Sequence, residues 1–467
     1  MKLYLSFFIL LIPVFVTADI VLPSIFGDHM VLQQQSESSI WGTATANKKV
    51  TLTTSWDKMS YDTRSDADGK WKIKVKTPVA GGPFKMTISD GKEMTLSDVL
   101  IGEVWICSGQ SNMQMPMKGY INQPILGSNE AVATSRNPRI RLFTVEREKS
   151  LTARTDFSGA WEECLPENVI DFSAAAYFFG RMINKALDVP VGLVCSSWGG
   201  TRIEPWISEN GLGSYDWVSL PDKNMNDEFS QQTPTVLYNA MIAPMVGYGI
   251  RGALWYQGES NRSEPREYEK LMEGLINNWR KEWDQGDFPF YYCQIAPFDY
   301  GHNKLSSAYL REAQLKAAMQ VPGAGMASLM DVGEKDNIHP ADKEAAGERL
   351  AYLALANTYG QKGIEYSGPV LKEMTVEGPL VKLTFDHAQN GLTTFGKELT
   401  SFQVAGENKR FFPANAFITR EGITLISERV PSPVAVRYAF EDYIIGELYN
   451  TEGLPASSFR TDDWEME

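Results

Sequence analysis

Between residues 98 and 362, nearly continuous apolar runs alternate with stretches whose apolar residues recur every three to four positions. The apolar runs begin near residues 99, 139, 189, 249, 288 and 325, and each has the length of one strand. Residues 268–283 place their apolar side chains on one helical face, and a second helix is expected from Pro340 to Gly360. Strands that are apolar on both faces and separated by helices usually pair in parallel. The segment 98–362 is therefore predicted to be an α/β domain, a parallel sheet with helices on both faces.

Both flanks of this domain show short runs in which apolar and polar residues alternate, separated by turn residues. A period of two is typical of strands with one buried face. Residues 19–97 and 363–467 are therefore each predicted to form a β-sandwich-like domain. Within the central domain, residues 209–235 are expected to form a long surface excursion of the kind that often shapes a binding site.

The first 18 residues place one lysine before a short apolar run and end in Val16, Thr17 and Ala18. This pattern is typical of a signal peptide with its cleavage site. We expect residues 1–18 to be removed on export to the periplasm or the cell exterior, with no membrane insertion afterwards. An uncleaved anchor is the alternative, although the run is short for a helix that crosses a bilayer.

The four cysteines are expected to be free thiols, because three of them lie in apolar, strand-like runs.

The charge balance limits the possible partners. The chain has 44 Lys and Arg against 58 Asp and Glu, which gives a formal net charge of −14. Nucleic-acid binding needs a concentrated basic face, and the sequence has no dense run of Lys or Arg. Nucleic acid is therefore excluded as an expected partner, and acidic membrane surfaces are disfavoured for the same reason.

Residues that directly follow the apolar runs are candidates for function, because ligands bind beyond the carboxyl ends of the strands in an open α/β sheet. One run ends in GQSNM, which would place the Ser111 hydroxyl at the sheet edge with its backbone N–H free. A helix-capping serine is the competing interpretation. A second run ends in WGGT, whose Gly199 and Gly200 permit close backbone approach, although a Gly-Gly turn needs no function. A third ends in WYQGESN, where the Gln257 amide is a neutral donor suited to an oxyanion.

The segment VGEKDNIHP places Asp336 three residues before His339. This spacing allows one turn to present the imidazole while the carboxylate accepts from Nδ1, so that Nε2 is free to act as a base. A metal site built on the same pair is the alternative, but the segment lacks further ligands at the spacing of known metal sites.

The blocks GQSNM, WGGTRIEPW, WYQGESN and DNIH resemble the four signature blocks of the SGNH hydrolases, and most closely those of the sialate O-acetylesterase family and related carbohydrate acetylesterases. The segments FGDHMVLQQ and LYNTEGLPASSFRTDDW also resemble that family's flanking segments, so the similarity covers nearly the whole mature chain. Many SGNH enzymes have Asn where this chain has Gln257, and the sialate O-acetylesterase branch is similar to this chain in having Gln. The resemblance implies an SGNH-hydrolase-like central sheet.

The resemblance also implies an activity, the hydrolysis of O-acetyl esters on sugars and in the first place on sialic acids, without a metal or an organic cofactor. The acetylated glycan would be the partner of the site. The residues that the resemblance assigns to catalysis are Ser111, Asp336 and His339, and those it assigns to the oxyanion hole are Ser111, Gly199, Gly200 and Gln257.

The sugar specificity is less defined. Arg202, Trp206 and Glu259 follow the glycine and glutamine blocks and are candidates for the substrate-binding surface, while an ion pair between Arg202 and Glu204 is equally open. Acetylated xylan or another neutral glycan is the alternative substrate. A non-catalytic glycan-binding protein is the alternative of another class, and the intact set of serine, aspartate and histidine argues against it.

Overall fold

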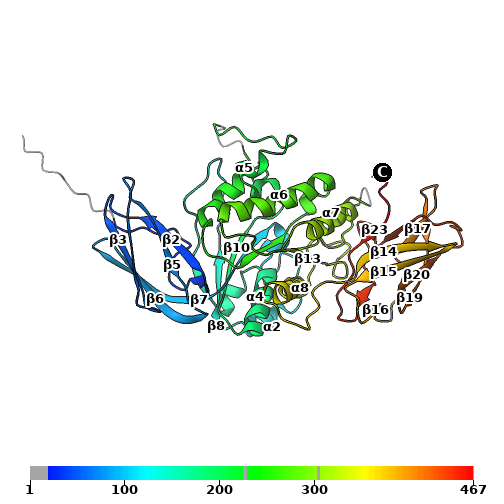
Figure 1. Ribbon diagram of the computed structural model, residues 1–467, viewed down its shortest axis with the longest axis horizontal. Helices are drawn as coiled ribbons and strands as arrows, with labels where there is room; N and C mark the ends of the chain where they lie inside the picture. The colour runs from blue at the N-terminus through cyan, green and yellow to red at the C-terminus, as the bar shows by residue number, and fades with distance from the viewer. Residues whose placement is uncertain (1–18, 225–228, 302–304, 466–467) are drawn as a thin grey trace, which may run out of the picture.

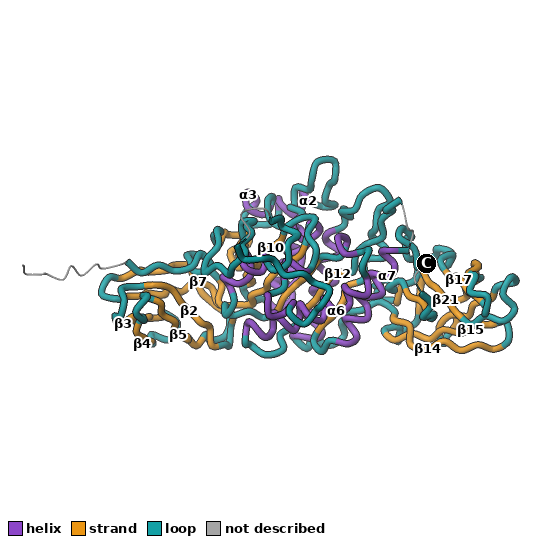
Figure 2. The backbone as a smooth tube through the Cα atoms, turned by 90° about the horizontal axis from the view of Figure 1, so that it is seen from above, coloured by secondary structure: helices purple, strands orange, loops and turns teal. Residues whose placement is uncertain are grey.

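The computed structural model describes residues 19–224, 229–301 and 305–465, so the expected signal segment 1–18 and His302 lie outside the described residues. Three regions follow one another along the longest axis of the molecule: strands from the N-terminal part, a mixed region in the middle, and strands from the C-terminal part (Figure 1). Figure 2, turned by 90°, shows the same order, with the long helices in the middle region.

The central sheet confirms the predicted parallel arrangement. Six strands run parallel in the order β13-β12-β11-β7-β10-β8, and β9 pairs with β8 in the antiparallel direction. All residues of β10, β11 and β12 are buried, which agrees with their continuous apolar runs. The strands are β7 (Glu93–Gly109), β8 (Asn137–Thr144), β9 (Trp161–Cys164), β10 (Val191–Ser197), β11 (Gly252–Tyr256), β12 (Phe290–Cys293) and β13 (Ala324–Ala327).

Helices cover both faces of this sheet, with α6 and α7 on one face and α4 and α8 on the other (Figure 1). Successive side chains of a strand point to opposite faces, so β11 contributes to both cores. Trp255 packs with the apolar side chains of α6, and Tyr256 packs with those of α4 and α8. The long helices are α4 (Ala174–Leu187), α6 (Pro265–Trp283), α7 (Ser306–Gln320) and α8 (Lys343–Leu353), and α8 continues into η5 (Ala354–Thr358).

The start of α8 differs from the prediction. The helix expected to open at Pro340 begins at Lys343, because the Asp342 side chain caps it by accepting a hydrogen bond from the Ala345 N–H at 2.9 Å. Pro340 lies in the preceding turn, where its carbonyl oxygen accepts a hydrogen bond from the Lys343 ammonium.

The N-terminal strands are joined to the central sheet through β7. The first part of this long strand pairs with β6 and the second part with β10 and β11, so the boundary expected near residue 97 falls inside β7. The other strands of this region are β1 (Val31–Gln33), β2 (Glu37–Thr43), β3 (Lys49–Thr54), β4 (Ser60–Arg64), β5 (Lys70–Lys76) and β6 (Gly81–Ser89).

The C-terminal region contains two antiparallel four-stranded sheets, β14-β15-β20-β19 and β18-β17-β21-β23, which share one apolar core. A short pair, β16 with β22, accompanies them. The strands are β14 (Val370–Glu377), β15 (Leu380–Asp386), β16 (Leu392–Thr393), β17 (Phe402–Ala405), β18 (Phe411–Pro413), β19 (Asn415–Thr419), β20 (Gly422–Ile426), β21 (Ala435–Tyr438), β22 (Tyr449–Asn450) and β23 (Phe459–Arg460).

Short helical turns connect the elements of the central region. They are α1 (Ser111–Gln114), α2 (Ser128–Ala133), α3 (Pro166–Val169), η1 (Glu204–Trp206), α5 (Glu209–Leu212), η2 (Tyr238–Ile242), η3 (Ala243–Met245) and η4 (Glu259–Asn261). All four cysteines are buried free thiols, as the sequence predicted.

Candidate active site

The first three sequence blocks meet at one edge of the central sheet. Gly109 ends β7, and it lies opposite Ser197, the last residue of β10, and Tyr256, the last residue of β11. Ser111, which opens α1, therefore projects from the carboxyl edge of the sheet, between the glycine block and the glutamine block.

The turn between β7 and α1 requires glycine. Gly109 has a φ of 137°, and a Cβ atom there would collide with the Tyr256 carbonyl oxygen. Gln110 then occupies the N-cap position, and Ser111 is the first helical residue. Ser111 is thus not the capping residue, and its N–H has no acceptor within the helix.

The two glycines of the second block differ in their surroundings. A Cβ atom on Gly199 would lie 3.3 Å from the Ser111 Cβ, so this backbone passes directly beside the serine. The Gly199 N–H, however, donates to the Gln114 Oε1 at 2.6 Å. Gly200 has a φ of 73° and open space around its Cα, and its N–H has no acceptor among the described residues. Gly200 is therefore the glycine whose N–H remains available to an oxyanion.

Gln257 is fully buried, and both of its amide hydrogens are already used. Its Nε2 donates to the Thr201 carbonyl oxygen at 3.1 Å and to the Asn261 Oδ1 at 2.8 Å. The Tyr268 hydroxyl donates to its Oε1 at 3.0 Å. In this arrangement Gln257 braces the glycine block against η4, and a hydrogen bond to an oxyanion would require one of these bonds to break.

His339 lies over the same edge of the sheet. Its ring packs edge-on against Tyr120 with 5.2 Å between ring centres, and the Tyr120 hydroxyl donates to the Ser111 carbonyl oxygen at 3.2 Å. The described residues include no hydrogen bond between the Ser111 hydroxyl and the imidazole, a contact that often tightens only when substrate is bound. Burial, assisted by the Lys343 ammonium, lowers the pKa of His339 to about 4, so the imidazole is neutral at pH 7.

The partner of the imidazole differs from the predicted one. His339 Nδ1 lies 2.6 Å from the Gln123 Oε1, whereas the Asp336 side chain is exposed to solvent and forms no hydrogen bond with His339 among the described residues. The loop takes this form because the Glu334 carboxylate accepts from the Ala341 N–H at 2.7 Å and from the Asn337 amide at 3.2 Å. Sequence analysis missed Gln123, which lies 216 residues from His339 in a loop without a recognisable pattern.

Arg202, Trp206 and Glu259, the three candidates for sugar binding, are held within the protein and do not form an open substrate-binding surface. Arg202 forms ion pairs with Glu204, at 2.7 Å, and with Glu264, so its guanidinium is engaged within the protein. Trp206 is fully buried and donates to the Thr201 hydroxyl. Glu259 is also buried. Of the two interpretations left open for Arg202, the structure shows the ion pair.

A cavity of about 760 Å³ lies beside α1. Two cations line it. Lys118 pairs with Asp171, whereas the Arg147 guanidinium has no carboxylate partner among the described residues and lies 5.8 Å from the centre of the Trp198 ring. Other lining residues are Gln114, Pro116, Gly119, Tyr120, Ile121, Thr144, Val145, Glu146, Ser173, Cys195 and Ser197. The cavity thus lies between α1, which Ser111 opens, and two cationic side chains that the sequence did not mark as candidates.

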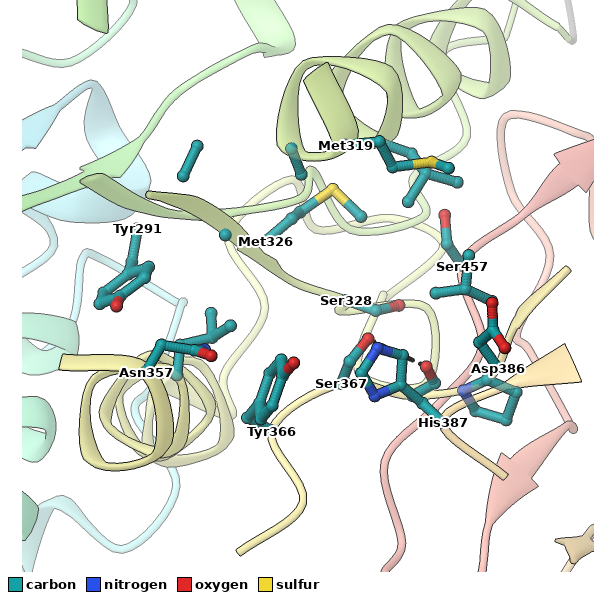
Figure 3. A pocket seen from close by; sticks show the side chains of 18 of the residues that line it. Tyr291, Met319, Met326, Ser328, Asn357, Tyr366, Ser367, Asp386, His387 and Ser457 are labelled. Carbon is teal, nitrogen blue, oxygen red and sulfur yellow. Dashed lines mark hydrogen bonds between the residues drawn. The ribbon is translucent and has the colours of Figure 1, made fainter. Parts of the chain in front are cut away.

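A second cavity, of about 410 Å³, lies between β13 and the C-terminal strands (Figure 3). Tyr291, Tyr366 and His387 are among its lining residues, and the His387 Nδ1 lies 2.9 Å from the Glu365 carboxylate. None of the described residues that line it belongs to the four sequence blocks, so it is separate from the serine site.

Within the described part of the chain, one group of residues has the spacing of metal ligands: His29, Asp98 and Glu163, whose ligand atoms lie within 4.8 Å of one another. The Arg141 guanidinium already donates to the Asp98 carboxylate at 2.8 Å and supplies the positive charge there.

Among the described helices, none combines the length and the apolar character that crossing a bilayer requires.

Comparisons with known proteins agree with this geometry. The family model described as carbohydrate esterase, sialic acid-specific acetylesterase, matches residues 101–356. The sialate O-acetylesterase of Homo sapiens is 30% identical over 93% of this chain and 91% of its own, and that of Mus musculus is 29% identical over 93% of both chains. The crystal structure of a carbohydrate acetylesterase from Xanthomonas citri is 33% identical and matches with a TM-score of 0.88 over 96% of this chain and 100% of its own.

The family match covers more than half of the chain, and the relatives extend the similarity over nearly all of it. The central sheet, the serine at its edge and the neighbouring histidine occur together in the matched segment. The chain therefore belongs to the sialic acid-specific acetylesterase family of carbohydrate esterases.

Proposed function

We propose that this carbohydrate acetylesterase removes O-acetyl groups from sialic acids, with Ser111 as nucleophile and His339 as general base. The observation that carries the proposal is the meeting of three groups at the sheet edge: a serine that does not cap its helix, a glycine pair that passes beside it and whose second N–H is free, and a neutral imidazole. Such a set is what an acyl transfer through a serine ester requires.

The reaction follows from these positions. His339 Nε2 takes the proton of the Ser111 hydroxyl as the oxygen attacks the acetyl carbonyl carbon. The N–H groups of Ser111 and Gly200 receive the developing oxyanion. The intermediate collapses to acetyl-Ser111, and the imidazolium returns its proton to the departing sugar oxygen. Water, deprotonated by the same histidine, then attacks the acetyl carbonyl carbon. Acetate leaves as the imidazolium returns its proton to the Ser111 oxygen, which restores the hydroxyl.

Gln123 is proposed to orient the base. An amide oxygen on Nδ1 fixes the ring with its proton on that nitrogen, which leaves Nε2 free to accept. An amide cannot neutralise the imidazolium as a carboxylate would. This limit agrees with the lowered pKa of His339. In the alternative, Asp336 serves as the acid of the triad, and its loop has to rearrange to bring the carboxylate to Nδ1.

The cavity beside α1 supports the proposal that the substrate is an anionic sugar. A sialic acid carries a carboxylate, and the unpaired Arg147 guanidinium can hold such a group in bidentate fashion at short range, even in a chain with a net charge of −14. Burial raises the pKa of the Tyr120 hydroxyl to about 12, and the Arg147 charge partly opposes this rise. Arg147 and Tyr120 line the same cavity, and Tyr120 packs against the His339 ring.

The test is acetate release from an O-acetylated sialic acid, an acetylated xylan and a neutral aryl acetate. Removal of a hydrogen bond between charged groups costs about 1.5–3 kcal/mol, so Arg147→Met is expected to raise the KM for the sialic acid by about 10- to 100-fold. The KM for the aryl acetate stays unchanged. Arg136→Met, a change at an exposed arginine outside the cavity, is the matched control. A preference for acetylated xylan, with equal effects of Arg147→Met on all substrates, would overturn the sialate assignment.

A further inference from the structure

Three buried polar side chains lie behind the proposed nucleophile and base and have no part in the mechanism above. Lys343 opens α8, Asn112 follows Ser111 in α1, and Glu259 opens η4 after β11. Their exposed fractions are 0%, 1% and 4%. Three separate elements thus bring polar groups together in the interior of the protein.

Asn112 connects the other two side chains. Its Nδ2 donates to the Glu259 Oε1 at 2.6 Å, and its Oδ1 accepts from the Lys343 Nζ at 2.8 Å. The ammonium also lies 5.7 Å from the centre of the Tyr256 ring. The Lys343 ammonium and the Glu259 carboxyl group are therefore linked through one neutral amide, and burial raises the pKa of that carboxyl group.

The same donors hold the backbone on both sides of the base. Asn112 Nδ2 donates to the Ile338 carbonyl oxygen at 3.1 Å, and Lys343 Nζ donates to the Pro340 carbonyl oxygen at 2.7 Å. Ile338 and Pro340 flank His339 directly. Because Asn112 is also the neighbour of the nucleophile, these bonds set the spacing between the serine segment and the histidine segment.

A purely stabilising role does not explain this arrangement well. A buried lysine is costly, and burial lowers the pKa of Lys343 to about 7 despite the nearby acidic groups. Apolar side chains of similar volume are often at least as stabilising as a buried ionic group. The hydrogen bonds are instead placed on the residues adjacent to the nucleophile and the base.

We propose that Lys343, Asn112 and Glu259 form a positioning network that holds His339 within reach of Ser111. The inference rests on the proposed function, since it takes Ser111 and His339 as nucleophile and base. It adds no group that touches substrate.

The charge of Lys343 has a measurable consequence at His339. A nearby cation disfavours imidazolium, so removing it raises the pKa of His339 and moves the acid limb of kcat/KM to higher pH. The other titratable groups around this pair are Glu259 after β11, Tyr256 in β11, Cys293 in β12, Tyr120 in the loop after α1, Asp342 at the start of α8, and Glu334 and the exposed Asp336 on the loop of His339 itself.

The experiment compares the full chain with Lys343→Met, with the double variant Lys343→Met/Glu259→Gln, and with Ser111→Ala. Lys185→Met, a change at an exposed lysine on the neighbouring helix α4, is the matched control. For each protein, kcat, KM, the pH profile for 4-nitrophenyl acetate and the midpoint of thermal unfolding are measured. The double variant removes both buried charges, so it separates the cost of an unpaired charge from the loss of positioning.

We expect Lys343→Met to lower kcat by about 10- to 100-fold with KM within about twofold, as misplacement of a reacting group does. In Lys343→Met the acid limb of kcat/KM shifts to higher pH. The double variant regains thermal stability without regaining kcat. A wild-type kcat and acid limb in folded Lys343→Met, or recovery of kcat together with stability in the double variant, would overturn the inference. Failure of both variants to fold would also overturn it, since the network would then be a requirement of folding. Activity in Ser111→Ala would instead contradict the proposed function.

Discussion

Two regions of the site have different surroundings: the polar residues that follow β10 and β11, and the loops that line the cavity beside α1. Gln257 and Glu259 follow β11 directly, and Trp206 lies in η1 after the glycine block; all three are buried and hydrogen-bonded within the protein. Gln123 lies in the loop between α1 and α2 and contacts the imidazole, and Arg147 lies in the loop that follows β8 and lines the cavity. Polar residues at strand exits therefore build the frame of this site as much as its chemistry.

The buried side chains and the cavity side chains also differ in how many protein partners hold them. The Gln257 amide is fixed by three protein partners. On the cavity side the Lys118 ammonium has one carboxylate partner, and the Arg147 guanidinium has none among the described residues. In the proposed mechanism the buried groups fix the spacing of Ser111 and His339, and the loop residues orient His339 and bind the sugar. The following predictions separate these two roles.

The largest effect is expected at the two reacting groups. Ser111→Ala and His339→Ala should each lower kcat for an aryl acetate by about 10⁴-fold or more, because members of such a unit lose activity together. Circular dichroism and thermal unfolding should show an intact fold. The assignment fails if either folded variant keeps a rate near that of the wild-type protein.

Replacement of the loop residue Gln123 by Leu should have the next largest effect. The imidazole loses the acceptor on Nδ1, so kcat is expected to fall by about 10- to 100-fold while the aryl acetate KM changes little. Steady-state kinetics of the purified variant provide the measurement. A rate within twofold of wild type would show that Gln123 does not orient the base.

The pH dependence follows from the low pKa of His339. Since the imidazole takes up a proton only near pH 4, kcat/KM should stay level from about pH 5 to neutral pH and fall about tenfold per pH unit below 4. Brief assays followed by return to pH 7 separate this loss from acid unfolding. A midpoint near 6.5, the ordinary value for histidine, would mean that the ring is more exposed or paired with a carboxylate in solution.

At the frame, Gln257→Ala should affect stability more than rate. It removes the two hydrogen bonds that Nε2 donates, to the Thr201 carbonyl oxygen and the Asn261 Oδ1, and the one that Oε1 accepts from the Tyr268 hydroxyl, at about 0.5–1.5 kcal/mol for each bond. The midpoint of thermal unfolding is expected to fall while kcat changes by less than about tenfold. A folded variant with unchanged stability and a kcat lower by about 10²-fold would instead identify Gln257 as an oxyanion donor.

The smallest effect is expected at Asp336. Its side chain is exposed in the structure, so Asp336→Asn should leave kcat within about twofold of wild type. A loss of 10²-fold or more would support the alternative in which the loop rearranges and Asp336 acts as the acid of the triad.

The sequence was sufficient to predict the central parallel sheet, because strands such as β10 and β11 are buried on both faces and keep an apolar run. It also placed Ser111 at the sheet edge, since a strand followed by a small turn residue leaves few other positions. The predicted start of α8 at Pro340 was wrong, because the Asp342 cap, three residues beyond His339, outweighs the preference of proline for a first turn. Gln123 and Arg147 were missed because their roles depend on tertiary contacts between loops, and no local periodicity marks them.

Detection of the acetyl-enzyme tests the central claim most directly. The protein is mixed with an O-acetylated sialic acid, quenched with acid during turnover and digested, and the peptides are analysed by mass spectrometry. We expect one added acetyl group on the peptide that contains Ser111, and none on that peptide in Ser111→Ala. An acetyl group on another residue of an active protein, or turnover of the sugar ester by Ser111→Ala, would contradict the account.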